Sequence, residues 1–151
     1  MRICVPALAG IFSCVAVAAF GQSADLTGTC TRTQTDSSAI CKIEQTDASI
    51  SFNLKTHFQA GELSGDMNGT ETYSPDGIER ETKTDTGRQR WLTAYWQGRS
   101  LVILRVVKDS YHVTVTREVW TTSEDRQTLS KNVRTIDMDG FRETTEVFTR
   151  Q

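Results

Sequence analysis

Beyond residue 22, apolar side chains recur at every second position rather than at the 3.6-residue spacing of an amphipathic helix. Short runs rich in Thr, Val and Ile alternate with turn formers such as Asn68-Gly69, Pro75-Asp76-Gly77 and Gln97-Gly98. The pattern predicts an all-β chain of short antiparallel strands. We expect strands over residues 26–33, 39–46, 49–58, 64–74, 78–85, 88–96, 100–107, 111–121, 127–136 and 141–150, with 59–74 also compatible with a loop.

A meander of eight to ten strands rarely stays flat, and it either closes into a barrel or folds into two sheets. Closure also removes exposed edge strands. Only one proline, Pro75, lies beyond residue 22, which suits continuous hydrogen-bonded ladders. We therefore expect a single antiparallel up-and-down β-barrel that forms one domain over residues 22–151.

Residues 1–21 have the pattern of a signal peptide. Arg2 precedes an uncharged apolar run over residues 3–20, and the small residues Ala19 and Gly21 suit a signal-peptidase site. We expect cleavage before Gln22, an exported periplasmic or secreted protein, and no stable membrane insertion afterwards. The alternatives are a transmembrane anchor, or lipidation at Cys14.

Two cysteines remain after such cleavage, Cys30 and Cys41, at positions symmetric about Thr35-Asp36. A turn centred there places the two cysteines opposite each other on the first two strands. An even pair in an exported chain predicts a Cys30–Cys41 disulfide, and the alternative is two buried free thiols. We expect no metal site, because no His or second Cys pair stands at ligand spacing.

Charge and motifs argue against two classes of protein. The 17 basic and 19 acidic residues give a formal charge of −2, which disfavours nucleic-acid binding as the main activity. No Ser, His and acid form a recognisable nucleophilic arrangement, and no Gly-rich phosphate loop is present. His112 shares its strand face with Thr114 and Thr116, which is typical of a solvated His. We expect no catalytic residue and no cofactor.

The segment Asp25-Leu26-Thr27-Gly28-Thr29, followed by a meander, is similar to the Gly-Thr-Trp opening of lipocalin-like (calycin) barrels. Short pieces at 74–79, 96–98 and 120–125 resemble small exported bacterial proteins of that type, which often have no assigned function. Cys30 departs from the pattern, because it stands where the opening Trp is expected. The resemblance implies a β-barrel with a possible apolar ligand, and it carries over no catalytic residue.

The hairpin around residues 108–110 suggests one ligand contact. A two-residue loop, Asp109-Ser110, gathers Val113, Val115 and Arg117 in one row that we expect to face inward. Arg117 would then pair with the carboxylate or phosphate head of a ligand. A three-residue loop would bring Arg105 inside as well. The alternatives for Arg117 are an internal salt bridge or a place on the outer face.

The aromatic residues Trp91, Tyr95 and Tyr111 are candidates for the walls of the pocket, with plain core packing as the alternative. Together these features predict a non-enzymatic protein that binds a small apolar or amphipathic molecule inside the barrel. The second hypothesis is a protein-binding module, such as an inhibitor of a secreted hydrolase, in which the interior is simply packed.

Overall fold

The chain folds into one antiparallel sheet of ten strands, described by a computed structural model over residues 23–83 and 88–151. The predicted signal peptide lies outside the described residues, within which no helix is long and apolar enough to cross a membrane. The strands are β1 (Gly28–Gln34), β2 (Ser37–Gln45), β3 (Ile50–Ala60), β4 (Leu63–Tyr73), β5 (Arg80–Lys83), β6 (Gln89–Gln97), β7 (Ser100–Lys108), β8 (Val113–Thr122), β9 (Thr128–Asp137) and β10 (Gly140–Arg150).

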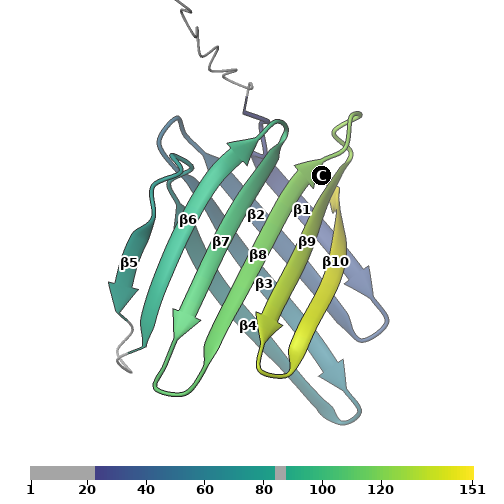
Figure 1. Cartoon of the computed structure of the whole chain (residues 1–151). Coiled ribbons are helices and arrows are strands. Elements are labelled where there is room, and N and C mark those ends of the chain that lie inside the picture. The colour runs from purple at the N-terminus through teal and green to yellow at the C-terminus, as the bar shows by residue number, and fades with distance from the viewer. Residues whose placement is uncertain (1–22, 84–87) are drawn as a thin grey trace, which may run out of the picture.

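Each strand pairs with its neighbour in sequence except at one place, and the first strand also pairs with the last. The order across the sheet is β4-β3-β2-β1-β10-β9-β8-β7-β6-β5. The all-β prediction and the ten antiparallel strands are confirmed, including β4, whose sequence was also compatible with a loop. The sheet bends so that β2, β3 and β4 lie behind β6 to β9 (Figure 1).

The expected closed barrel is not what the structure contains. In the described part of the chain, β4 and β5 do not pair with each other, so the sheet is open along this one seam. The segment after β4 instead reaches β6 through a single bridge, Asp76 to Tyr95. β5 is only four residues long, which is too short to pair along the eleven residues of β4. The fold is therefore a meander split along one seam rather than a closed barrel.

The first hairpin has the register that the cysteine spacing predicts. Thr35 and Asp36 form the turn, and Cys30 stands directly opposite Cys41. The predicted disulfide is not present, because both residues are buried free thiols. Burial raises the pKa of the Cys41 thiol to about 12, so this thiol stays protonated and unreactive at neutral pH. The pair contributes to the structure as two small apolar side chains.

The hydrophobic core fills only one end of the space between the two halves of the sheet. This is the end at the top of Figure 1, where β2 is followed by β3 and β6 by β7, and we call it the upper end. It is built from inward-facing residues of almost every strand, among them Ile43, Ile50, Leu101, Leu129 and Phe148. Aromatic rings hold its centre: Phe52 lies 4.5 Å from Trp120, and Trp120 lies 6.0 Å from Phe148, between ring centroids. The upper end is therefore packed, whereas the lower ends of the strands extend beyond the core.

We predict that Phe148→Ala destabilises the protein by about 3–5 kcal/mol, because it removes a buried ring and leaves a cavity against Trp120. The matched control is Phe141→Ala on the same strand, where the ring is 61% exposed and the change should stay within about 1 kcal/mol. Urea denaturation measures both. An equal loss of unfolding free energy in the two variants would contradict the placement of the core.

Candidate functional site

Below the core, the inward face of the sheet changes from apolar to charged. Moving two residues down a strand leads from Trp120 to Glu118 on β8, and from Leu129 to Lys131 on β9. The same change occurs at one level on seven of the ten strands. We call this set the polar belt, and it consists of Arg32, Glu71, Arg90, Arg105, Glu118, Lys131 and Glu146.

Cations and carboxylates alternate along the polar belt. Glu146 pairs with Arg32, and its other oxygen lies 3.9 Å from Lys131 Nζ. Lys131 Nζ also lies 3.7 Å from Glu118 Oε2, and Arg105 Nη1 donates to Glu118 Oε1 at 3.1 Å. Glu118 is only 7% exposed. A carboxylate this buried requires charged partners on both sides, and the belt supplies them.

The belt also spans the open seam. Arg105 on β7 donates to Glu71 on β4 at 3.0 Å, and Arg90 on β6 lies 3.5 Å from the same carboxylate. The Tyr73 hydroxyl donates to Glu71 as well. Side-chain ion pairs thus connect β4 to β6 and β7, with which it shares no backbone ladder.

These contacts change how Glu71 and Tyr73 titrate. Burial works to raise the pKa of Glu71, but the Tyr73 hydrogen bond and the charges of Arg105 and Arg90 outweigh it, so the pKa lies below its usual value. The pKa of Tyr73 is raised, first by burial and then by its bond to the Glu71 carboxylate. Glu71 is therefore an anion and Tyr73 a neutral donor at neutral pH.

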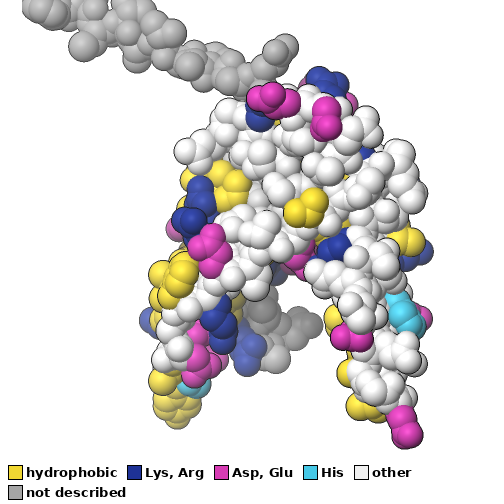
Figure 2. Space-filling view, turned by 90° about the vertical axis from the view of Figure 1, so that its right-hand side faces the viewer, with side chains coloured by type: hydrophobic (Ala, Val, Ile, Leu, Met, Phe, Trp, Pro, Cys, Tyr) yellow, Lys and Arg dark blue, Asp and Glu magenta, His cyan; other side chains and the backbone are white. Residues whose placement is uncertain are grey.

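A cleft of about 470 Å³ lies between the inner faces of the two halves of the sheet, and it runs from the lower edge of the core past the polar belt to the open end. Its size suits a small molecule. Figure 2 shows the molecule spread into two legs at this lower end, with a hollow between them. The lining residues come from β2, β3, β4, β8 and β9: Cys41, Phe52, Leu54, Thr56, Met67, Asn68, Gly69, Thr70, Glu71, Tyr73, Glu118, Trp120 and Lys131.

Two glycines on β4 differ in what packs over them. At Gly65 an added Cβ would lie 2.8 Å from Phe58 Cζ, so the Phe58 ring packs directly over this glycine. At Gly69, which faces the cleft, an added Cβ would meet nothing within 4 Å. The cleft is therefore open at Gly69, whereas Gly65 lies under the Phe58 ring and is not part of the cleft lining.

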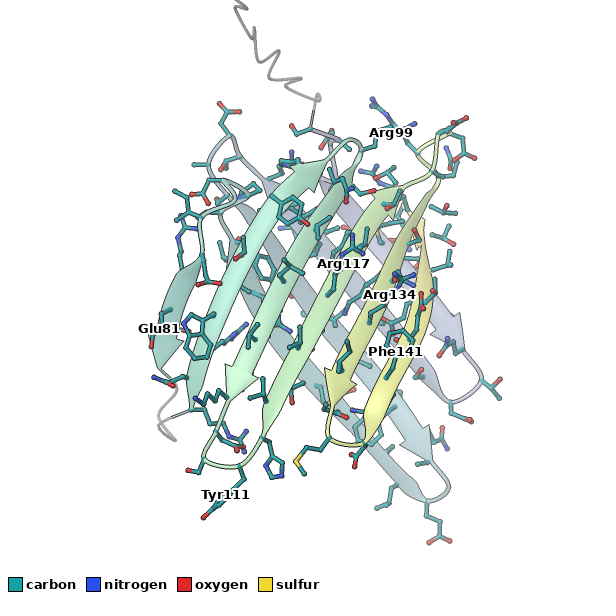
Figure 3. All side chains as sticks on the ribbon, viewed as in Figure 1. Glu81, Arg99, Tyr111, Arg117, Arg134 and Phe141 are labelled. Atoms are coloured by element: carbon teal, nitrogen blue, oxygen red, sulfur yellow. The ribbon has the colours of Figure 1, made fainter. Side chains whose placement is uncertain are left out.

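The expected inward position of Arg117 is wrong. Arg117 pairs with Leu104 and Arg134, and its guanidinium donates to Gln97 on β6 at 3.4 Å. Its neighbour Glu118 faces inward, so Arg117 must face outward. Figure 3 shows Arg117 and Arg134 on the outer face of β8 and β9. Arg105, the second candidate, does lie inside, as part of the polar belt.

The aromatic candidates do not line the cleft either. Trp91 pairs with Val106, and Tyr95 pairs with Val102, in rows on the outer face of the sheet. Tyr111 is 87% exposed in the loop between β7 and β8 (Figure 3). Trp96, the neighbour of Tyr95, packs against the core instead.

The outer face carries an apolar row that crosses five strands in register. Val106 stands opposite both Trp91 and Val115, and Ile136 stands opposite both Val115 and Phe141. Val115, Ile136 and Phe141 are exposed. The valines that predict an inward row do share one face, as expected, but that face is the outer one.

Trp120, an aromatic residue that the sequence also offers as a pocket wall, does line the cleft, but sequence reasoning missed Phe52, Leu54, Met67 and Lys131. One signal was available: in several strands a charged residue stands two positions from a bulky apolar residue, as Glu118 does from Trp120. Within the described residues, no group of three or more His, Cys, Asp or Glu is placed to hold a metal ion.

Comparison with known proteins adds no identity to this geometry. No family model matches the chain, and no curated protein matches it.

The lowered pKa of Glu71 predicts an acid-sensitive seam. Because the folded-state pKa lies below the unfolded value of 4.5, the carboxylate stabilises the fold above about pH 4.5, and this stabilisation is lost as the pH falls through the folded-state pKa. Glu71→Gln should therefore be less stable than wild type at neutral pH, and the difference should disappear in acid. Urea denaturation across a pH series measures it.

The control is Glu44→Gln, which removes an exposed carboxylate paired with Lys42 at 2.7 Å. Solvent screens that pair, so this variant should show a smaller difference at neutral pH. A Glu71→Gln difference that persists unchanged in acid would contradict the assigned role of the carboxylate.

Proposed function

We propose that the protein binds a small amphipathic molecule in the cleft between the two halves of the sheet. The observation that carries this proposal is a space of about 470 Å³ whose lining combines apolar and aromatic side chains with the ionised groups of Glu71, Glu118 and Lys131. Phe52, Leu54 and Met67 offer apolar contact, and the edge of the buried Trp120 side chain lines the space as well. A molecule with an apolar tail and a polar end matches this division.

The shape of the fold supports the same proposal. The core fills the upper part of the molecule without help from the lower ends of β3, β4, β8 and β9. The inner residues there, such as Thr56, Met67 and Thr114, remain at least partly exposed. Strands that extend beyond the core and leave an open, partly apolar space between them are suited to holding a ligand.

We also propose that the chain is exported and related to the lipocalin-like barrels. The support for export is the uncharged apolar run over residues 3–20. The support for the relationship is the up-and-down order of the strands, with β1 paired to β10.

A second candidate function is protein binding through the outer face. The specific observation is the apolar row from Trp91 to Phe141, which a partner sheet or loop could cover. Ile136→Glu separates the two functions, because it places a charge in that row and leaves the cleft untouched. Ligand binding that is unchanged in Ile136→Glu, together with its loss in a cleft variant, supports the first candidate.

We predict that Gly69→Leu abolishes binding by filling the cleft. The new side chain enters open space, and β4 gains a residue with better strand propensity, so the fold should be retained. The measurement is fluorescence titration with N-phenylnaphthylamine, an uncharged apolar probe. The wild type should enhance its emission in a saturable manner, and Gly69→Leu should not.

The matched control is Thr72→Leu, which adds the same side chain to the same strand on the opposite face. Thr72 bonds to Ser51 on the exterior, 2.7 Å between hydroxyl oxygens, and does not line the cleft. Binding should survive in this variant. If the wild type binds no probe, or if Gly69→Leu binds as wild type does, the proposed cleft is not the binding site.

A further inference from the structure

We infer that the cleft selects an amphipathic ligand whose polar end carries one negative charge, such as a carboxylate, and that Lys131 receives this group. The inference rests on the proposed function and adds the chemical class of the ligand and the residue that recognises it.

The first argument is the charge of the polar belt. Its cations are Arg32, Arg90, Arg105 and Lys131, and its carboxylates are Glu71, Glu118 and Glu146. Four positive charges against three negative ones leave an excess of one positive charge. The ion pairs form one chain, which begins at Arg32 and ends at Arg90. Every carboxylate of the belt therefore already lies between two cations. A half-buried excess charge favours a bound anion.

The second argument is the hydrogen-bonding demand of the site. The buried side-chain atoms without a partner include the Nε atoms of Arg32, Arg90 and Arg105, and Nε1 of Trp120. All four are donors. Among the described residues, no carboxylate oxygen is buried without a partner. The belt and its surroundings thus have more donors than acceptors. Of these four residues only Trp120 lines the cleft, so its indole N–H is the unpartnered donor that an acceptor oxygen of a ligand there would meet.

The third argument singles out Lys131 among the four cations, because it alone lines the cleft. Its ammonium lies 3.7 Å from Glu118 and 3.9 Å from Glu146, distances at which the charges attract but no hydrogen bond forms. The same nitrogen lies 5.2 Å from the centroid of the Trp120 ring. Its three donors are therefore available, and a small rotation would direct them to a ligand oxygen.

The remaining contacts place the tail. With its anion at Lys131, a ligand extends toward the open lower end past Leu54 and Met67, where the lining is apolar. Glu71 and Glu118 also line the cleft, but each is held by two cations of the belt and presents little net charge to the ligand. An anionic head group at the belt and a tail toward the open end satisfy both parts of the site.

The test compares three probes with the same tail: dodecanoate, dodecanol and dodecyltrimethylammonium. Each is titrated, at concentrations where it remains monomeric, against the protein saturated with N-phenylnaphthylamine. For wild type we expect dodecanoate to displace the dye at the lowest concentration. Lys131→Gln should lower the affinity for dodecanoate by about tenfold and leave the affinity for dodecanol within about twofold of wild type. Rising salt should weaken dodecanoate binding to wild type and leave dodecanol unaffected.

The matched control is Lys42→Gln, on an outward-facing side chain of β2 that pairs with Glu44. This variant should change the binding of neither dodecanoate nor dodecanol. Lys131→Arg keeps the charge and should retain a preference for dodecanoate over dodecanol. Circular dichroism confirms that each variant is folded. If Lys131→Gln does not fold, the salt dependence and the order of the three probes in wild type decide the question.

The outcomes separate the two proposals. If the dye itself does not bind, the proposed function fails. If the dye binds but dodecanol or dodecyltrimethylammonium displaces it as well as dodecanoate does, cleft binding stands and the anionic ligand class is overturned. If Lys131→Gln weakens dodecanoate and dodecanol equally, Lys131 is a structural residue and its assigned role is overturned.

Discussion

The alternation of charges in the polar belt is the constraint on which the rest of the structure depends. Removing an ionised side chain from water is costly unless a partner of opposite charge accompanies it. Glu118 at 7% exposure meets this condition only because Arg105 and Lys131 approach it from neighbouring strands. The register of β7, β8 and β9 must therefore be held, since a shift by one residue would turn Glu118 outward and leave its cations inside.

The same belt explains how an open sheet keeps a fixed shape. A closed barrel joins its last seam with backbone hydrogen bonds, but β5 is too short to provide them along β4. Glu71 instead reaches across the seam to Arg105 and Arg90. Side chains hold strands further apart than a ladder does, because a ladder requires a separation of about 4.8 Å. Glu71, which makes these contacts across the seam, also lines the cleft.

The strand pattern was predictable from the sequence because turn residues and a period of two act locally. Thr35 and Asp36 set the first hairpin, and Gly98, with a φ of 58°, permits the tight turn between β6 and β7. The position of Cys30 opposite Cys41 follows from the first of these turns. The broken seam was not predictable, since it depends on contacts between strands that are distant in sequence.

The facing of the strands could not be derived from hydrophobicity alone. β7 is apolar on both faces, with Leu101 and Ile103 inside and Val102 and Leu104 in the outer row. On β8 the usual rule is reversed below the core, because Thr114, Thr116 and Glu118 face the interior while Val113 and Val115 face solvent. The loop before β8 spans residues 109–112, closed by Asp109 Oδ1, which accepts from the backbone N–H groups of Tyr111 and His112. This loop changes the register but not the shared face of Val113, Val115 and Arg117; Arg117 was assigned to the wrong face because its apolar row was expected to face the core.

This reversal carries information about function. A side chain row that is polar inside and apolar outside is unfavourable for a strand whose only role is to cover a core. It is suitable for a strand whose upper part packs and whose lower part borders a solvated space. β8 changes at Glu118, β9 at Lys131 and β10 at Glu146, all at one level. A common level across strands that are separate in sequence indicates a boundary between two regions of the interior, the packed core above and the open cleft below.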